Sequence, residues 1–373
     1  MKGIECIELR KFITEYKQKN EKNEFKPVAV GKYGIRTRES IYSKELAKDY
    51  SKNKIIFKNT LTVGMGSRQI DIGILTDDVI YSVSPAYHTY KISDINADYL
   101  RYCLMCRNED MFKRFVKRGS RQGKSIDLKR WLEYEIPVYD VCNQEKIVLK
   151  LNKVTNVISM RKQQLQKLDE LIQARFVELF GEPILNPKEW KIVTIGDIAL
   201  DVRYGTSRPA VEGGKYPYLR MNNLTIDGHL DLTDLKYIDI PEDELEKCVV
   251  RKGDILFNRT NSLELVGKTA VFDLCEDMVI AGYIIRVRLN NKMMLPEIFS
   301  QYMNHKTLKK ILRGMAKGAV NQANINAKEL QSIKIYVPNM KLQDEFVTFV
   351  NQVNKSKLVI KNLLQIYKHQ IQM

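Results

Sequence analysis

The sequence predicts an α+β protein with two similar globular domains, each followed by a long helix. The two helices are expected to pack as an antiparallel coiled coil with pseudo-two-fold symmetry. Three observations support this fold class: an internal repeat, strand-like runs separated by turn residues, and a heptad pattern in two long segments. We expect a first domain over 1–141, a central helix over 142–182, a second domain over 183–340 and a C-terminal helix over 341–373.

The repeat is clearest where each domain meets its helix. The stretch "IPVYDVCNQEKIVLKLNKV" (136–154) returns as "VPNMKLQDEFVTFVNQVNK" (337–355), so that Gln144 and Gln343 correspond at an offset of 199 residues. At the same offset, "SIDLKRW" (125–131) falls on "NINAKEL" (324–330). The register slips only near the start of each copy. A repeat unit of this length is too long for a solenoid and indicates two similar domains.

Each copy opens with strand-like runs. In the second copy these are "WKIVTIGDIA", "YPYLRMNNL", "GDILFNRT", "GKTAVFDL" and "MVIAGYIIRVRL", rich in β-branched and aromatic residues and bounded by Gly, Asn and Asp. A helical stretch follows, "LPEIFSQYMNHKTLKKILRGM", and then a last strand, "IKIYVP". The expected domain is therefore mixed, with much strand.

The two long helices carry an apolar seam whose spacing alternates between four and three residues, which is a heptad repeat. In the first helix Arg161, Arg175 and Leu179 continue the seam, and in the second Lys357 interrupts it. The apolar seam positions are Ile147, Leu151, Val154, Ile158, Leu165, Leu168, Ile172, Phe346, Val350, Val353, Ile360 and Leu364. Two independent helices, each lying on its own domain, are the alternative interpretation.

An antiparallel pairing is favoured by the short connection after the first helix. Forty helical residues would extend about 60 Å, whereas the eight residues between Gly181 and Trp190 reach at most about 29 Å. A parallel pairing would require the chain to return along the whole helix before the second domain begins.

Composition indicates a polyanionic partner. The formal net charge is +16, and such a balance favours nucleic acid first and an anionic membrane second. No segment is long and apolar enough to span a membrane, and six scattered cysteines fit reduced thiols, so we expect a cytoplasmic protein. A merely basic chain without a polyanionic partner is the alternative.

The sequence contains no recognisable catalytic motif. "GKT" at 267–269 lacks the earlier glycine of a phosphate loop, and neither a nucleophile-elbow motif nor a zinc-protease motif occurs. Cys103 and Cys106 form a lone pair without the further ligands that a zinc site needs. We therefore expect neither a metal nor a cofactor on this chain, and no enzymatic activity of its own.

Recognition chemistry is present instead, in loops of both copies. Lys and Arg neutralise phosphates, whereas Arg, Asn and Gln also pair with base edges. For each single residue a solvated loop position is the simpler interpretation, but the set as a whole favours a DNA-binding face. The candidates are Arg36, Arg38, Ser67, Arg68, Gln69, Arg121 and Lys124 in the first copy, and Tyr204, Thr206, Arg208, Arg220, Asn222, Arg259, Asn261, Lys268, Asn321 and Gln322 in the second.

These residues resemble a known family. "YLRMNNLTIDGHL", "RKGDILFNRTNSLELVGKTAVF" and "INAKELQSIKIYVPNMKLQDEFV" are similar to target-recognition phrases of the DNA-specificity subunit of type I restriction–modification systems. The central stretch 141–183 resembles the spacer helix of that family. The resemblance covers essentially the whole chain and is weaker in the first copy, where Ile4 stands at the position of Trp190.

The resemblance implies a function. It implies a non-catalytic subunit that reads a bipartite double-stranded DNA target, one domain per half-site. It also implies docking of two methyltransferase subunits and of restriction subunits, with S-adenosylmethionine, ATP and Mg used by those partners and not by this chain. A stand-alone sequence-specific DNA-binding protein and a purely structural coiled-coil adaptor are the alternatives. The target bases and the gap length do not follow from the sequence.

Overall fold

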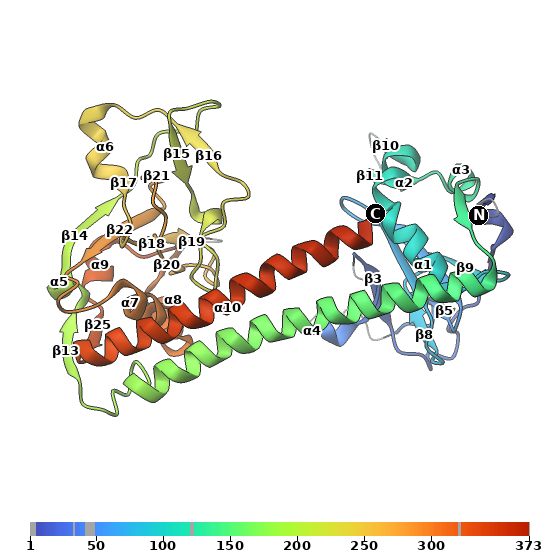
Figure 1. Ribbon diagram of the computed structural model, residues 1–373. Coiled ribbons are helices and arrows are strands. Elements are labelled where there is room, and N and C mark those ends of the chain that lie inside the picture. Colours follow the sequence, from blue (N-terminus) through green and yellow to red (C-terminus); the bar gives the residue numbers. More distant parts are fainter. Residues whose placement is uncertain (1–4, 33, 42–48, 120–122, 320–321, 373) are drawn as a thin grey trace. The chain divides into compact units, whose positions relative to one another are not determined.

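The structure is a computed structural model that describes residues 5–32, 34–41, 49–119, 123–319 and 322–372. At 118, 119, 317–319, 322 and 368–372 it describes the backbone alone. The chain forms two compact units, unit 1 (residues 1–161 and 363–373) and unit 2 (residues 162–362). The division between the units lies inside the two longest helices, α4 (Val141–Phe180) and α10 (Met340–Gln372) (Figure 1).

Unit 1 is a mixed domain built around an antiparallel four-stranded sheet in the order β2-β9-β6-β7. The strands of unit 1 are β1 (Glu5–Glu8), β2 (Ile13–Glu15), β3 (Val28–Gly31), β4 (Gly34–Thr37), β5 (Lys54–Ile56), β6 (Thr60–Met65), β7 (Ile70–Leu75), β8 (Tyr81–Val83), β9 (His88–Ile92), β10 (Val116–Gly119), β11 (Gly123–Ile126) and β12 (Glu135–Val138). Its shorter helices are η1 (Leu9–Lys11), η2 (Arg38–Ser40), α1 (Ala97–Cys106), α2 (Asn108–Phe115) and α3 (Leu128–Leu132).

Unit 2 repeats this plan around the antiparallel sheet β14-β22-β18-β20. Its strands are β13 (Lys191–Thr194), β14 (Ala199–Tyr204), β15 (Tyr216–Leu219), β16 (Lys236–Ile238), β17 (Val249–Val250), β18 (Ile255–Asn258), β19 (Thr260–Asn261), β20 (Thr269–Val271), β21 (Met278–Ile280), β22 (Ile284–Leu289), β23 (Lys317–Ala319), β24 (Gln322–Asn324) and β25 (Lys334–Val337). Its shorter helices are α5 (Ile195–Ile198), η3 (Met221–Asn223), α6 (Glu242–Cys248), α7 (Pro296–Asn304), α8 (Lys306–Met315) and α9 (Ala327–Gln331).

The common plan extends beyond the central sheets. In each unit the first strand pairs antiparallel with the last, β1 with β12 and β13 with β25. Two helices then precede a β-hairpin, a short capped helix and the long helix: α1, α2 and β10–β11 correspond to α7, α8 and β23–β24. The fold is thus α+β with two similar domains, as the sequence predicts.

The repeated glutamine fastens each long helix to its domain. Gln144 and Gln343 are 2% and 0% exposed. The side-chain carbonyl of Gln144 accepts a hydrogen bond from the backbone N–H of Asn96 at 2.9 Å, and that of Gln343 accepts one from Leu295, also at 2.9 Å. These two donors are the residues that precede α1 and α7. We call each of these two arrangements a glutamine joint.

The amide nitrogen of each glutamine donates to the carbonyl of the residue after the last strand, and that of Gln343 also donates to a carbonyl ahead of α7. Gln144 donates to the carbonyl of Tyr139, and Gln343 donates to the carbonyls of Pro338 and Met293, at 2.7 to 2.9 Å. A buried amide with both its acceptor and its donor satisfied has little orientational freedom. The joint therefore fixes the start of the long helix against the domain in both units.

The two long helices are antiparallel where unit 2 contains both. Arg175 contacts Glu345, Phe176 stacks edge-on with Phe346, and Asp169 contacts Lys357. From Arg175 and Phe176 to Asp169 the residue number falls along α4, whereas the number of the partner on α10 rises from 345 and 346 to 357. This order of contacts is antiparallel, as the sequence predicts.

The seam of α4 departs from the expected heptad near its C-terminus. The sequence predicts Arg175 and Leu179 as seam positions, but the structure buries Phe176 and Phe180 to 1% and 0% exposure. Both phenylalanines belong to the core of unit 2, next to Phe346. The apolar face of a straight helix rotates by about 20° per heptad relative to a strict heptad repeat. At the C-terminal end of α4 the helix also packs against the core of unit 2 and not only against α10, so the buried face is shifted by one residue.

The other predicted seam residues lie as follows. On α10, Phe346, Val350, Val353, Ile360 and Leu364 are all buried, and Ile172 is buried on α4. Six further positions of α4 are partly buried: Ile147, Leu151, Val154, Ile158, Leu165 and Leu168. Lys357 is 5% exposed, so the polar seam position is inside the helix pair.

Candidate nucleic-acid interface

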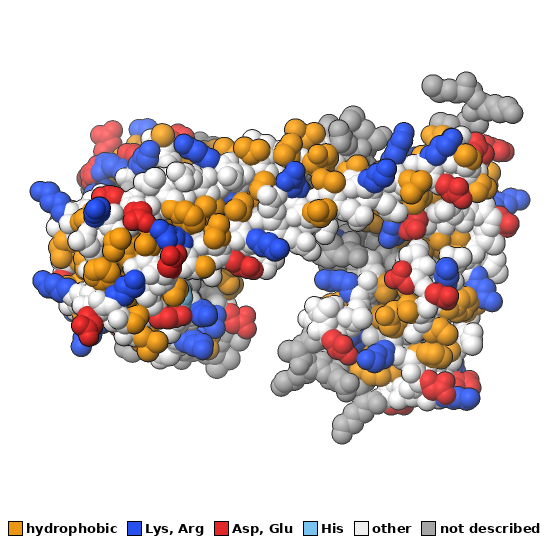
Figure 2. Space-filling model, turned by 60° about the horizontal axis from the view of Figure 1, so that its bottom comes forward, with side chains coloured by type: hydrophobic (Ala, Val, Ile, Leu, Met, Phe, Trp, Pro, Cys, Tyr) orange, Lys and Arg blue, Asp and Glu red, His pale blue; other side chains and the backbone are white. Residues whose placement is uncertain are grey.

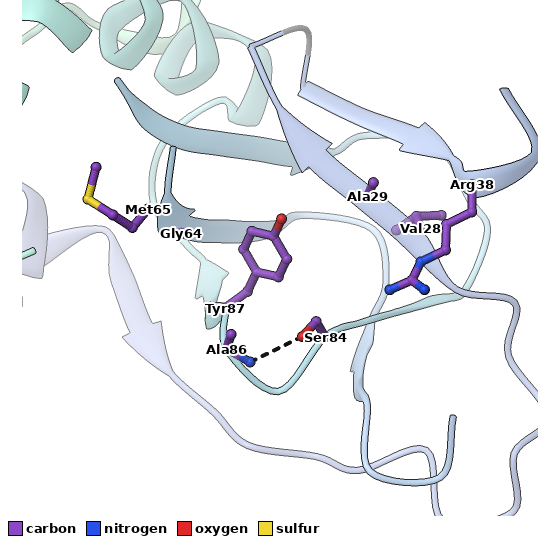
Figure 3. A pocket seen from close by; sticks show the side chains of 8 residues that line it. All are labelled: Val28, Ala29, Arg38, Gly64, Met65, Ser84, Ala86 and Tyr87. Carbon is purple, nitrogen blue, oxygen red and sulfur yellow. Dashed lines mark hydrogen bonds between the residues drawn. The ribbon is translucent and has the colours of Figure 1, made fainter. Parts of the chain in front are cut away.

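In unit 1 one of the predicted DNA-contacting segments lines a cavity, and a second follows a strand that lines it. The first segment is the end of β4 with η2, which carries Arg36 and Arg38. The second is the β6–β7 turn, which carries Ser67, Arg68 and Gln69. The cavity has a volume of about 300 Å³, and its wall includes Arg38 from the first segment and Gly64 and Met65 from the end of β6, the strand that leads into the turn. Figure 3 shows Tyr87 and Arg38 at this cavity, with the Arg38 guanidinium directed toward it.

The β6–β7 turn is a tight structure that exposes its polar side chains. Gly66 donates its N–H to the carbonyl of Gln69 at 3.1 Å, and a Cβ at Gly66 would lie 2.6 Å from the Asp71 carboxylate. Burial raises the pKa of Asp71, while the Gln69 side chain donates to it at 3.4 Å. The side chains of Ser67 and Arg68 are exposed at the tip.

Lys124 reaches the same turn from β11. Its ammonium donates to the carbonyl of Ser67 and lies 5.4 Å from the ring centroid of Phe112. This places a cation beside Arg68, so that basic side chains from β11 and from the turn share one edge of unit 1. Arg121 lies outside the described residues.

Unit 2 gathers four of the predicted residues around the short sheet β19-β24-β23. Tyr204 ends β14, Arg259 precedes β19, and Asn261 lies in β19 in register with Ala323. The Arg259 guanidinium lies 5.0 Å from the ring centroid of Tyr204. Gln322 is in β24, next to β19, with only its backbone described, and Asn321 lies outside the described residues.

The backbone around Arg259 is held on both sides. Its N–H donates to the carbonyl of Tyr283 at 3.0 Å, and its carbonyl accepts from the N–H of Ile325 at 2.9 Å. The Tyr204 hydroxyl accepts a hydrogen bond from the N–H of Ala327. The stacked pair therefore has rigid supports at both the arginine and the tyrosine.

Three other predicted residues of unit 2, Thr206, Arg208 and Arg220, form hydrogen bonds or ion pairs within the protein. Arg208 forms a two-point ion pair with Glu244, with distances of 3.0 and 2.7 Å. Arg220 donates to the carboxylate and the carbonyl of Asp234 at 2.8 and 2.9 Å. The Thr206 hydroxyl accepts from the N–H of Arg208, and Asn222 is exposed on η3.

Lys268 corrects a prediction. We expected it to contact DNA, but its ammonium is buried and donates to the carbonyls of Met221 and Leu224. Lys268 therefore holds η3 and the chain after it against β20. The Gly-Lys step itself is a turn, with Gly267 at φ +80°.

Lys309 was not predicted. It lies on α8 and donates to the carbonyl of Gly267. Burial, together with the charges of Arg313 and Lys268, lowers the pKa of Lys309 to about 7. The sequence could have pointed to Lys309 only through its place on the inner face of an amphipathic basic helix. Because lysine on such a helix is ordinarily solvated, the pattern alone does not predict that Lys309 is buried.

A second unpredicted cluster surrounds Lys357. The Lys357 ammonium contacts the Asp169 carboxylate and lies 3.5 Å from Nε2 of His229. Desolvation and the Lys357 charge lower the pKa of His229. His229 lies in the loop after η3, the short helix that Lys268 holds in place. The contact between His229 and Lys357 therefore connects this loop to the helix pair.

Charged side chains of both signs lie on the surface of the molecule (Figure 2). On the face in Figure 2, lysine and arginine side chains are interspersed with acidic ones over both units. Among the described residues there is no group of three or more His, Cys, Asp or Glu able to hold a metal ion. No helix of the described chain has the length and hydropathy required to cross a bilayer.

Comparison with known proteins gives matches along both copies. The family model described as "Type I restriction modification DNA specificity domain" matches residues 7–170 and 187–366. The EcoKI type I restriction enzyme specificity subunit of Escherichia coli is 25% identical over 258 residues, which are 62% of this chain and 55% of that protein. A protein assigned as the MjaX type I restriction enzyme specificity subunit of Methanocaldococcus jannaschii is 29% identical over 179 residues, 45% of this chain and 42% of that protein. The matches thus span about half the length of these curated relatives.

Solved structures share the fold. The type I restriction-modification S subunit from M. genitalium aligns with a TM-score of 0.53 and 15% identity, covering 100% of this chain and 95% of that one. A chain from a study of complex assembly and conformational transition of the type I R-M system aligns with a TM-score of 0.55 and 18% identity, covering 100% and 96%. At these identities the likeness concerns the fold alone.

Proposed function

This chain belongs to the family of type I restriction modification DNA specificity domains, and from this membership we propose that it selects the DNA target of a type I restriction–modification complex. In this proposal each unit reads one half-site of a bipartite sequence. The observation that carries it is the repeat itself: two copies of one frame, each with its own family match, present different loops. A single chain with two different binding surfaces can recognise two different short DNA sequences separated by a gap.

Partners supply the chemistry in this proposal. We propose that methyltransferase subunits dock on the chain and modify adenine with S-adenosylmethionine, and that restriction subunits use ATP and Mg. The chain itself contributes positioning: basic residues such as Arg68 and Lys124 bind phosphates, and residues with forked donors read bases. We expect the complex to act in the cytoplasm, with the cellular DNA.

The length of α4 is proposed to set the gap between the half-sites. This helix is continuous for 40 residues and belongs to both units. Removing seven residues, 158–164, shortens a helix by about 10 Å and keeps the heptad phase. Because the deleted residues precede Asp169, the contacts of Asp169, Arg175 and Phe176 with α10 are retained.

The experiment is to co-express the chain with its methyltransferase subunit and to sequence the methylated motif. The wild-type complex is expected to give a bipartite motif, and the seven-residue deletion a gap shorter by about three base pairs with both half-sites unchanged. A two-residue deletion, 158–159, rotates the two parts of the seam by about 200° relative to each other and is the control, expected to abolish methylation. Methylation at a contiguous motif would refute the proposed function, and an unchanged gap would refute the role of α4. Specific DNA binding without any methyltransferase would favour a stand-alone regulator.

A further inference from the structure

The candidate arginines fall into two classes by their partners. Arg208 and Arg220 are bound to Glu244 and Asp234. To contact a base, either would first have to leave a carboxylate that already occupies its donors. Such a pair fixes the surrounding loop, and its charge is neutralised before DNA arrives.

Arg38 belongs to the other class. Its guanidinium makes neither a hydrogen bond nor an ion pair with any residue that the structure describes, and its Nε is buried without an acceptor. It lies 5.3 Å from the ring centroid of Tyr50. It also forms part of the wall of the 300 Å³ cavity, opposite Ser84 and Tyr87 (Figure 3).

Arg259 has the same character in unit 2. Its guanidinium lies over Tyr204, and its Nε is likewise buried without an acceptor in the described chain. Its one side-chain hydrogen bond to a described residue is long, at 3.5 Å from Nη1 to the carbonyl of Gly282. No carboxylate among the described residues pairs with it.

A tyrosine-stacked arginine is well suited to reading a base. The ring restricts the orientation of the guanidinium plane by a cation–π contact but accepts none of its in-plane hydrogen bonds. With Nε facing the protein, the terminal Nη donors remain as a fork, and two parallel donors match the O6 and N7 acceptors of guanine. The restricted rotamer also lowers the entropy that is lost on binding.

We propose that Arg38 and Arg259 are the guanine-reading residues of unit 1 and unit 2, one in each half-site. This inference rests on the proposed function and deepens it. Arg38 and Arg259 do not correspond in the repeat: 259 minus 38 is 221, whereas the glutamine joints are 199 residues apart. The two units therefore place a tyrosine-stacked arginine on loops that are not equivalent in the repeat.

The test uses the full-length chain in complex with its methyltransferase subunit. Arg38→Ala is expected to reduce discrimination at one G·C position of the first half-site by roughly 5- to 150-fold, with the second half-site unchanged. Arg259→Ala is expected to do the reverse. Arg208→Ala is the matched control in unit 2 and is expected to leave the methylated motif unchanged.

Arg38→Lys and Arg259→Lys keep the charge and lose the fork. They are expected to relax the same position while retaining overall DNA affinity and salt dependence, which a merely structural role would not predict. If Arg38→Ala impairs folding, as judged by thermal unfolding, the lysine variant decides the question. An unchanged motif in both lysine variants, or an equal loss on all DNA sequences, would overturn the proposal.

Failure of this inference is distinguishable from failure of the proposed function. A wild-type complex that methylates a bipartite motif supports the function whatever the variants do. The inference fails while the function stands if the wild-type motif is bipartite but no G·C position in it is sensitive to either arginine, or if the variants weaken binding to all DNA sequences equally.

Discussion

Unit 1 and unit 2 place the same glutamine at the same joint, yet surround their candidate DNA-contacting residues with different structures. Gln144 and Gln343 each accept a hydrogen bond from an equivalent backbone N–H at 2.9 Å. By contrast, Arg38 lies beside a β3–β4 hairpin, and Arg259 lies beside the sheet β19-β24-β23. The joint admits one geometry because its groups are buried and satisfied. The loops face solvent, where sequence change is tolerated. The frame is therefore held constant while the reading surfaces differ.

The largest expected effect tests the joint. Gln343→Leu leaves one N–H and two carbonyl groups buried without partners, and each such group costs about 1–3 kcal/mol. We expect a loss of more than about 3 kcal/mol in the free energy of unfolding of unit 2, measured by urea denaturation. Gln144→Leu should have a smaller effect, in unit 1, because Gln144 makes two such bonds. Gln352→Leu, at an exposed position of α10, is the control. Equal stability of Gln343→Leu and this control would show that the joint is dispensable.

The next effect concerns Lys357, whose counterpart in the repeat is Ile158. Asp169→Asn leaves the buried ammonium without its carboxylate and is expected to destabilise unit 2 by about 1.5–3 kcal/mol. Lys357→Ile gives α10 the residue that α4 has in the same register. It is expected to be neutral or stabilising, because the remaining Asp169 is 40% exposed and can be hydrated. Thermal unfolding of both variants measures the difference, and a strong loss in Lys357→Ile would show that the ion pair itself stabilises the helix pair.

A smaller effect compares the caps of two equivalent helices. Asn326 caps α9 in a reciprocal capping box with Glu329, whereas Asp127 caps α3 through a single 3.4 Å bond. Asn326→Ala is expected to cost about 1 kcal/mol and Asp127→Ala less. Denaturant unfolding of the two variants measures this order. The reverse order would mean that the ion pair between Asp127 and Lys117 outweighs the missing half of the box.

The smallest effect is a pH dependence confined to unit 2. The pKa of Lys309 is about 7 in the folded chain and about 10.4 when unfolded. Between these values the unfolded chain binds more protons, so the free energy of unfolding rises with pH. Relative to Lys309→Met, the wild type should gain roughly 0.7 kcal/mol between pH 6.5 and 7.5. Urea titrations of both proteins at the two pH values measure this, and parallel pH profiles would show that Lys309 is charged throughout.

Much of the fold follows from the sequence because its signals are local or repeated. The heptad spacing predicts the two helices and their burial along Phe346 to Leu364 on α10. The repeat at an offset of 199 residues predicts two similar domains, and Gln144 and Gln343 occupy corresponding positions in it. The antiparallel order of the helices followed from the reach of eight residues after Gly181, which is a matter of chain length alone.

Tertiary structure decided which of the predicted residues pair with other groups of the protein. Glu244 lies 36 residues beyond Arg208, Asp234 lies 14 beyond Arg220, and no sequence spacing predicts these pairs. Lys268 is buried because η3 folds over its ammonium, and Phe176 replaces Arg175 on the buried face because a domain core meets the helix end there. Periodicity fixes which face of a helix or strand is apolar. The partner of a charged side chain depends on which distant loop packs beside it, and that is settled only when the chain has folded.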